Sequence, residues 1–318
     1  MYEYILLLLS PIIEPIISGD TWPLIMRFMP FIIFYELPYT LLIYAGVMKY
    51  IWERKREGQR RDYFPPVSCI ITCYSEGREV QGTIRSLTEQ IYPGKIALIA
   101  MIDGASRNRD TYEAALDMKD YVRGIENRRL EVVPKWQRGG RVSNINTGLN
   151  YVTGEIVFVL DGDTSFDNNM VERAVRHFED PSVAAVSGCL RVRNADSSLA
   201  ASLQAVEYFI SIQTAKTGLS EFNIVNNVSG AFGIFRRSVV ELVRGWDAGT
   251  AEDLDMTLRI KQYFGRSNGK FRIIFDPEAM GHTDVPDTFL GYFKQRIRWD
   301  GDLPFIYFKK HWRAFRPR

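Results

Sequence analysis

Between residues 67 and 160 the sequence alternates short apolar runs with amphipathic stretches, and this alternation limits the possible folds more than any other feature. The amphipathic stretches are 79–90, 110–122 and 141–152, where apolar residues recur at helical spacing. A sheet that alternates with helices in this way is mostly parallel and is covered on both faces. The sequence therefore predicts an α/β fold with four buried strands, VSCIITC (67–73), KIALIAMI (95–102), LEVV (130–133) and EIVFVL (155–160).

Composition narrows the class of protein. The 318 residues are 46% hydrophobic and 25% charged, which suits one large globular domain with some residues to spare. A net charge of +2 gives no support for nucleic-acid binding. Cys69, Cys73 and Cys189 form neither a disulfide framework nor a metal-type pair, so we expect a reducing compartment and a packing role for Cys69 and Cys73.

Polar segments follow all four predicted strands. Ligands of open α/β sheets bind at the carboxyl ends of the strands, so these segments predict one shared pocket. No GxxxxGK[ST] or GxGxxG sequence is present at these turns, which argues against phosphate-loop and dinucleotide sites. The segments are YSEG (74–77), DGASRNRD (103–110), PKWQRGGR (134–141) and DGDTSFD (161–167).

The DGD triplet places Asp161 and Asp163 directly after a buried strand, with Gly162 between them. Two adjacent carboxylates repel each other unless a cation or hydrogen-bond donors compensate. A hard divalent ion that also binds diphosphate oxygens would do so. A triplet of this kind by itself suits a turn cap equally well, but its place after the strand favours the metal.

A second acidic segment, GTAEDLDMTLRI (249–260), predicts a helix with Thr250 as a candidate cap. Glu252, Asp253 and Asp255 would fall in its first turn. Taken alone, this pattern is explained by the interaction of carboxylates with the positive end of the helix dipole.

The segment FLGYFKQRIRWDGD (289–302) is also predicted to be helical, and its spacing brings cations and an indole to one face. Gln295, Arg298 and Trp299 follow one another at helical spacing. A guanidinium suits a diphosphate leaving group, and an indole suits the apolar face of a sugar ring.

An apolar stretch from Phe28 to Met48 is long enough to cross a membrane and has Glu36 as its only charge. The earlier run 4–17 is shorter and interrupted, so it predicts a second, bent span or an interfacial segment. The basic segment ERKREGQRR (53–61) follows, and by the positive-inside rule it places residue 53 onward in the cytoplasm. The alternative is a pair of buried core helices.

Five motifs, given at the end of this paragraph in chain order, resemble the D, DxD, (T/E)ED and QxxRW series of membrane-embedded processive family 2 glycosyltransferases. This family includes the cellulose, chitin, hyaluronan and poly-N-acetylglucosamine synthases. The resemblance implies a GT-A fold, a nucleotide-diphosphate sugar donor that is usually UDP-linked, Mg²⁺ or Mn²⁺, and inversion to a β-glycoside. The motifs are IDG at 102, DGD at 161, SGAFGIFRR at 229, AED at 251 and QRIRW at 295.

The resemblance also implies a role for each matching position. Asp253 would be the general base that deprotonates the acceptor hydroxyl. The nucleotide would be held by Glu76, Asp103 and Asp161, and the metal by Asp163 with Asp161. The diphosphate and acceptor would be contacted by Gln295, Arg296, Arg298, Trp299, Glu252, Gly230 and Arg141, the last standing where the family commonly has lysine in GGKxxxxN.

The expected organisation is a membrane anchor (1–52), a basic linker (53–64), a cytoplasmic GT-A domain (65–286), and the QxxRW helix with an amphipathic interface tail (287–318). Residues 198–218 resemble the interface helix of the family; packing against the catalytic domain is the alternative. The expected location is the cell membrane, and the expected partners are a UDP-sugar, a saccharide acceptor and lipid, with no nucleic acid.

Several functions stay open at this point. Family members usually continue after QxxRW into membrane helices that form an export channel, so we expect a channel-forming subunit or self-association here. The alternatives to polymer synthesis are addition of a single sugar to a lipid or small acceptor, an inactive scaffold, and nucleotidyl transfer. The intact aspartates argue against the scaffold, and the lack of a glycine-rich basic loop near the first strand argues against nucleotidyl transfer.

Overall fold

The structure is a computed structural model that describes residues 10, 17–19, 21–55, 62–267, 270–301 and 303–312. Most of the apolar run 4–17 lies outside the described residues, as do residues 56–61 of the linker 53–64 and residues 302 and 313–318 of the tail.

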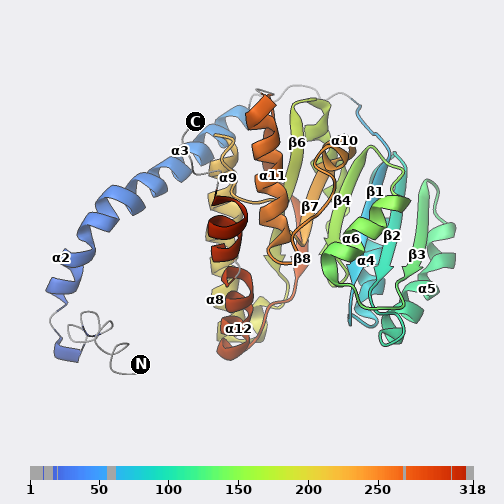
Figure 1. The fold of residues 1–318 in the computed structure, drawn as a ribbon, viewed down its shortest axis with the longest axis horizontal. Coiled ribbons are helices and arrows are strands. Elements are labelled where there is room, and N and C mark those ends of the chain that lie inside the picture. The colour runs from blue at the N-terminus through green and yellow to red at the C-terminus, as the bar shows by residue number, and fades with distance from the viewer. Residues whose placement is uncertain are drawn as a thin grey trace.

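One eight-stranded sheet forms the centre of the molecule (Figure 1), in the order β3-β2-β1-β4-β7-β6-β8-β5. The four predicted strands are all present and make a parallel half-sheet. β7 then runs antiparallel to both β4 and β6, β8 is parallel to β6, and β5 is antiparallel to β8. The strands are β1 (Val67–Cys73), β2 (Ile96–Ile102), β3 (Arg128–Pro134), β4 (Ile156–Asp161), β5 (Ser165–Phe166), β6 (Val183–Val192), β7 (Phe232–Arg236) and β8 (Arg272–Thr283).

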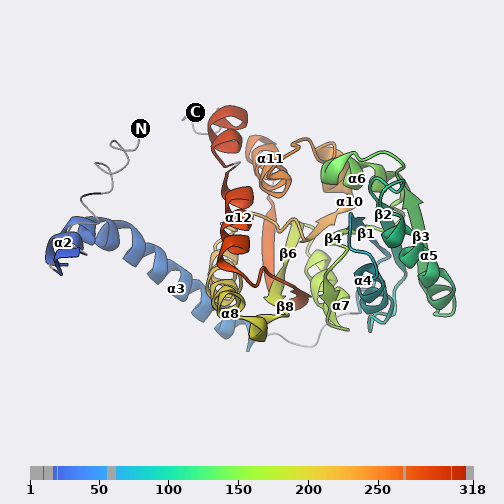
Figure 2. The same ribbon diagram turned by 90° about the horizontal axis from the view of Figure 1, so that it is seen from below.

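Helices cover both faces of this sheet, as the sequence predicts (Figure 2). α4 (Glu79–Thr88), α5 (Arg109–Arg123) and α7 (Met170–Val175) pack on one face. α6 (Gly140–Gly148), α10 (Arg237–Leu242) and α11 (Glu252–Ser267) pack on the other. Short 3₁₀ turns are η2 (Leu149–Tyr151), η3 (Arg176–Glu179) and η4 (Ala195–Ser197).

The strands are apolar on both sides because each face meets a layer of helices. Along β1, Cys69 and Ile71 join the core under α4 and α5, whereas Ile70 joins the core under α6 and α11. This alternation follows from the two-residue period of a strand. Cys69, Cys73 and Cys189 are free and buried, which confirms packing roles for Cys69 and Cys73.

The predicted membrane span lies within a helical segment made of α2 (Trp22–Phe31), the π-helical turn η1 (Ile32–Glu36) and α3 (Leu37–Arg54). Its part from Ile25 to Arg54 is long and apolar enough to cross a membrane, and only 6% of its apolar window is buried. That exposure excludes a core helix of the domain as the explanation of this segment. Figure 1 shows α3 running away from the sheet.

The inner end of α3 is fixed to the domain through α9. After α8 (Leu199–Glu207) and the π-helical segment η5 (Tyr208–Thr214), α9 (Ala215–Ser220) crosses α3 at two glycines. A Cβ on Gly46 would overlap the backbone of Gly218, and a Cβ on Gly218 would overlap the carbonyl of Ile43. Lys49 adds a hydrogen bond to the Glu221 carbonyl (3.0 Å) and an ion pair with its carboxylate (3.3 Å). Backbone contact of this kind requires small residues at the crossing.

The variant Gly218→Ala is therefore expected to push α3 off α9, at a cost of about 1–3 kcal/mol in the free energy of unfolding. Carbodiimide cross-linking of Lys49 to Glu221 would report the separation as a loss of the cross-link. Gly82→Ala in α4 is the matched control, because no atom lies within 4 Å of its Cβ position; it should be neutral or stabilising by up to about 1 kcal/mol. An undiminished cross-link in Gly218→Ala would contradict the close crossing.

The helix predicted over the QRIRW motif is α12 (Phe289–Asp300), and η6 (Phe305–Lys310) follows it. η6 is fixed to α11, because the buried carboxylate of Asp255 pairs with His311 Nε2 (2.8 Å) and Lys310 Nζ (2.9 Å). These helices and the α8–η5 segment expose large apolar side chains, as a membrane-surface segment would. The exposed set is Leu199, Leu203, Val206, Phe209, Ile210, Phe289, Leu290, Phe293, Ile297, Trp299, Phe305 and Phe308.

Candidate active site

The residues predicted to share a pocket lie where β1, β2 and β4 end at one edge of the sheet. Asp161 is the last residue of β4, Asp103 directly follows β2, and Glu76 lies three residues beyond β1. Parallel strands bring their carboxyl ends together, which explains why these residues meet despite their separation in sequence.

Asp103 is 2% exposed and organises the next loop. Its two carboxylate oxygens accept hydrogen bonds from the backbone N–H groups of Gly139 (2.8 Å) and Gly140 (2.9 Å). Gly140 has φ +77°, a conformation that favours glycine. The turn starts α6 and so places Arg141 at the site. Both oxygens of Asp103 are thus engaged by the protein itself, and its nucleotide contact stays a prediction.

Arg141 joins two carboxylates that come from distant elements. Its Nη1 is paired with Asp161 of β4, and its Nε lies 2.7 Å from Glu252 Oε1 of α11. Its Nη2 donates to the carbonyl of Gly230, just before β7. Burial alone would lower the pKa of Arg141, but Asp161 and Glu252 outweigh it and raise the pKa. A lysine at this position has no planar fork with which to make all three contacts.

Three carboxylates lie close to one another beside this arginine. Burial, reinforced by Asp163 and Asp161, raises the pKa of Glu76 to about 7. Burial followed by Asp161 also raises the pKa of Asp163. Glu76 Oε2 is buried and has no hydrogen-bond partner within the described part of the chain. Gly162 permits this packing, since a Cβ there would lie 3.3 Å from Glu76 Cδ.

Such a site suits a divalent cation, because a cation relieves repulsion between carboxylates. Asp161 is already paired with Arg141, which leaves Asp163 and Glu76 as the carboxylates most open to a metal. Among the described residues no group of three or more His, Cys, Asp or Glu side chains is already arranged as a metal site. A metal would therefore have to take further ligands from a bound substrate or water.

The raised pKa of Glu76 predicts a pH dependence of stability. Since the folded chain holds this proton more tightly than the unfolded chain, Glu76 should destabilise the fold progressively as pH rises from about 4.5 to about 7. Glu76→Gln should therefore remove part of the fall in stability over this window. Urea unfolding of both proteins at pH 5 and pH 8 in chelator would measure it. Equal pH dependence in the two proteins would be inconsistent with the burial of this carboxyl.

Asp253 lies in the first turn of α11, one residue from Glu252. Its Oδ1 accepts from the Leu254 N–H (2.8 Å), and its Oδ2 accepts from Asn227 Nδ2 (2.8 Å) and from the Gly230 N–H (3.3 Å). Glu252 and Asp255 have separate partners, described above. Each acidic residue of this turn thus makes its own tertiary contact, and interaction with the helix dipole alone does not explain them.

The QRIRW residues lie on α12, and one of them is paired with α8. Arg296 Nη2 donates to Glu207 of α8 (2.7 Å), and its guanidinium lies 4.3 Å from the Trp299 ring. Gln295 is half-buried and Arg298 is exposed. Within the described ranges, no hydrogen bond or ion pair links these four residues to Asp161, Asp163 or Asp253. Their contact with the diphosphate and acceptor stays a prediction.

Sequence reasoning missed three residues of the site. Thr72 lies in an apolar strand, yet its Oγ1 donates to Asp161 Oδ1 (3.3 Å) and accepts from Arg141 (3.0 Å). Asn227 binds Asp253, and Lys216 binds Asn227. The one sequence signal for Lys216 was its charge, since the other residues of the segment 215–220 are small or apolar.

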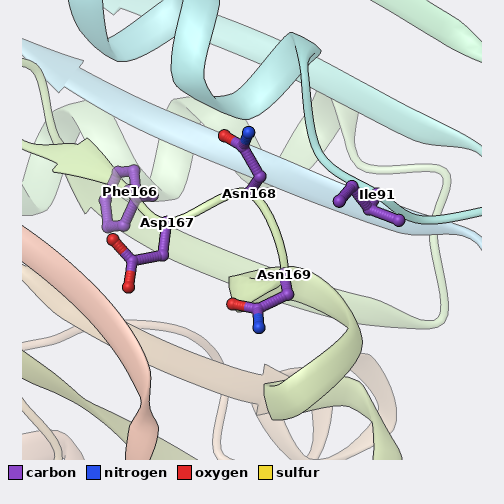
Figure 3. Close-up of a pocket in the computed structure, with 5 residues that line it drawn as sticks. All are labelled: Ile91, Phe166, Asp167, Asn168 and Asn169. Carbon is purple, nitrogen blue, oxygen red and sulfur yellow. The ribbon is translucent and has the colours of Figure 1, made fainter.

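A separate shallow hollow lies at the turn between β5 and α7 (Figure 3) and is lined by Ile91, Phe166, Asp167, Asn168 and Asn169. None of these is a predicted site residue. Asp167 is paired with His282 Nε2 (2.8 Å), so His282 has a structural hydrogen bond. The carboxylate cluster at the strand ends remains the better candidate for the active site.

Comparison with known proteins assigns the family. The family model described as "Glycosyltransferase like family 2" matches residues 65–301. The chain belongs to this family. Residues 65–301 are thus a glycosyltransferase domain with a GT-A-like fold, as the sequence motifs predict.

Individual relatives agree with this assignment. A poly-beta-1,6-N-acetyl-D-glucosamine synthase of Staphylococcus epidermidis is 28% identical over 283 residues, covering 86% of this chain. A synthase of the same name from Staphylococcus aureus (strain COL) is 28% identical over 285 residues. The chain spans 65% of the length of these relatives.

The fold also matches a solved structure, the mannosyltransferase PcManGT from Pyrobaculum calidifontis in complex with GDP-Man and Mn²⁺. The TM-score is 0.57 at 20% identity, over 84% of this chain and 72% of that one. At this identity the likeness concerns the fold alone.

Proposed function

We propose that this glycosyltransferase-like family 2 chain is a membrane-bound inverting glycosyltransferase that uses a UDP-sugar to elongate a β-linked polysaccharide. The observation that carries the proposal is the Arg141 cluster, in which Asp161 of the DGD motif and Glu252 of the AED motif share one guanidinium. The names of the Staphylococcus relatives favour N-acetylglucosamine as the transferred sugar and a β-1,6 linkage.

In this proposal Asp253 is the general base. It removes the proton of the acceptor hydroxyl, whose oxygen attacks the anomeric carbon while the bond to the diphosphate breaks, so a single displacement inverts that centre. Its carboxylate is held by three donors, which fixes its direction. Arg141, at the junction of Asp161 and Glu252, is placed to meet the negative charge that develops on the leaving diphosphate.

The nucleotide and metal are assigned to the carboxylates beside Arg141. Glu76, Asp103 and Asp161 hold the nucleoside. Asp163 holds Mg²⁺ or Mn²⁺ together with Oδ2 of Asp161, whose Oδ1 is paired with Arg141. A bound divalent ion supplies charge neutralisation on the diphosphate. Glu76 Oε2, which has no hydrogen-bond partner among the described residues, and the raised pKa of Asp163 support a cation here.

The membrane part of the proposal rests on the apolar helix Ile25–Arg54 and on the exposed apolar faces of α8 and α12. With the anchor in the cell membrane, the catalytic domain would face the cytoplasm, where UDP-sugars are found. Export of a polymer would require a channel, and a channel-forming partner subunit or self-association is part of the proposal.

The deciding experiment is donor turnover by membranes that contain the full chain. The panel would include UDP-N-acetylglucosamine, UDP-glucose, UDP-glucuronate and GDP-mannose, each with Mg²⁺, Mn²⁺ or chelator, and products would be separated by size. A β-linked product of high molecular weight from a UDP-sugar is the expected result. Turnover of GDP-mannose alone, or of no donor, would overturn the proposed donor class.

A second candidate is transfer of a single sugar to a lipid or small acceptor. The observation in its favour is that, among the described residues, no hydrogen bond or ion pair links Gln295, Arg296, Arg298 or Trp299 to the carboxylate cluster, although the polymer proposal assigns them to the diphosphate and acceptor.

Trp299→Ala separates the two candidates. If Trp299 stacks under an acceptor sugar, this variant should lower polymer formation by up to about tenfold, since aromatic stacking contributes about 0.5–1.5 kcal/mol. Donor hydrolysis should stay near the wild-type rate. Phe308→Ala, which removes an exposed aromatic ring of η6, is the control. Equal loss of polymer formation and hydrolysis in Trp299→Ala would favour single-sugar transfer.

A further inference from the structure

We propose that Lys216 and Asn227 position the carboxylate of Asp253: Lys216 fixes the orientation of the Asn227 amide, and Asn227 in turn holds Asp253 by a hydrogen bond. Neither residue was named as a candidate site residue from the sequence, although Lys216 lies within the segment 198–218 described above. This inference rests on the proposed function, in which Asp253 is the base.

The hydrogen bonds form one continuous chain. Lys216 Nζ donates to Asn227 Oδ1 (2.9 Å) and to the Asn227 backbone carbonyl (3.1 Å). Asn227 Nδ2 then donates to Asp253 Oδ2 (2.8 Å). The three residues come from α9, from the loop before β7 and from α11, so the chain crosses three separate segments.

Donor and acceptor roles explain why a lysine is suited to this position. A side-chain amide can turn over and exchange its oxygen and nitrogen. An ammonium group only donates, so it requires the amide oxygen on its own side. The Asn227 N–H₂ group is thereby directed to Asp253. Without the lysine, the amide would be held on this side only by Asp253 itself, so amide and carboxylate would be free to shift together.

Burial of Lys216 indicates that its place is maintained at some energetic cost. The residue is 8% exposed, and within the described part of the chain it has no ion pair with a carboxylate. Burial lowers the pKa of Lys216 to about 8, and Asp253 partly opposes this effect. A buried amine that binds neutral oxygens destabilises the fold relative to an apolar residue, so its role is more easily explained by the site than by stability.

The membrane helix holds Lys216 in place. Gly218, two residues further along α9, is the residue that touches Gly46 and Ile43 of α3. α9 is also bound to β8, because the Phe275 N–H donates a hydrogen bond to Ser220 Oγ (2.9 Å). The position of Lys216, and through it the direction of Asp253, therefore depends on the docking of α3.

A double-mutant cycle on the full chain in membranes tests this chain of hydrogen bonds from Lys216 through Asn227 to Asp253, called the relay below. The measured quantities are kcat and KM for the donor that wild type uses. Asn227→Leu should lower kcat by roughly tenfold to a hundredfold with little change in donor KM, because a small displacement of the base affects only the chemical step. Lys216→Met should lower kcat about tenfold in the same way. The double variant should be no slower than Asn227→Leu, because residues in one chain of contacts are not additive.

Lys261→Met is the matched control. Lys261 of α11 is also a partly buried lysine, and its amine donates to the Val225 carbonyl in the same loop without touching Asn227. Its removal should lower stability but leave kcat near the wild-type value. Lys216→Gln retains a hydrogen-bond donor at the position and should recover part of the kcat lost in Lys216→Met. If Lys216→Met does not accumulate, the kcat of Lys216→Gln is compared with wild type instead.

The outcomes separate this inference from the proposed function. Turnover by wild type together with its loss in Asp253→Asn tests the function, and only the Lys216 and Asn227 variants test the relay. Multiplicative losses in the double variant, a rise in KM with unchanged kcat, or equal effects of Lys216→Met and Lys261→Met would each overturn the relay.

Discussion

Asp253→Asn is expected to lower sugar transfer by about 10²–10⁴-fold, the usual contribution of a general base, while donor binding is retained. The amide cannot accept a proton, but Arg141, Asp161 and Glu252 keep their contacts with one another. Since both oxygens of Asp253 accept hydrogen bonds, the new N–H₂ group faces a donor on either side, and we expect a loss of about 1–3 kcal/mol in stability. Initial rates and UDP binding to the same membranes measure the two effects.

The control for this substitution is Asp110→Asn, which removes an exposed first-turn carboxylate from α5. Like Asp253→Asn, this substitution removes a negative charge from the first turn of a helix, which costs about 0.3–1 kcal/mol of stability through the helix dipole. It leaves the site unchanged. Its turnover should match wild type. If Asp253→Asn also turned over at the wild-type rate, Asp253 would not be the base.

Arg141→Met is expected to affect both activity and stability. Asp161 and Glu252 would lose their shared cation, and breaking a buried ion pair costs about 3–5 kcal/mol. Because the side chains of Arg141 and Asp161 are 28% and 31% exposed, we expect about 2–3 kcal/mol here. Turnover should fall by at least about 10²-fold, since a donor to the developing diphosphate charge is also lost. Urea unfolding and initial rates are the measurements.

Two further variants sharpen this test. Arg141→Lys keeps the charge but not the fork, so it should recover part of the stability and less of the rate. Arg237→Met removes an exposed arginine paired with Glu241 in α10 and should change stability by less than about 1 kcal/mol. An Arg141→Met variant as stable as Arg237→Met would mean that the carboxylates do not depend on this cation.

Most of the parallel half-sheet was predictable from the sequence. The segments 67–73, 95–102, 130–133 and 155–160 coincide with β1 to β4 within one or two residues, because strands covered on both faces are nearly continuous apolar runs. The antiparallel β7 and its neighbours were not identified. SGAFGIFRR was recognised only as a motif, although its second half forms β7 between β4 and β6.

The candidate site was predictable in part. Asp161, Glu252, Gly230 and Arg141 were each named from motifs, and the structure brings them into contact. Thr72, Lys216 and Asn227 were not, since a threonine in a strand and a lysine in a helix carry no sequence signature of what they bind. The QRIRW residues were also named from a motif, but the ion pair of Arg296 with Glu207 of α8 was not foreseen.

The sequence by itself determined the family, the alternation of strands and helices, and an apolar segment able to cross a membrane. These depend on local periodicity and on short motifs, which are properties of neighbouring residues. Only the tertiary structure decided that Asp103 organises the turn before Arg141, that Gly46 meets Gly218, and that Lys216 reaches Asp253 through Asn227. Such contacts join residues distant in sequence, and their partners are chosen by packing of the whole chain.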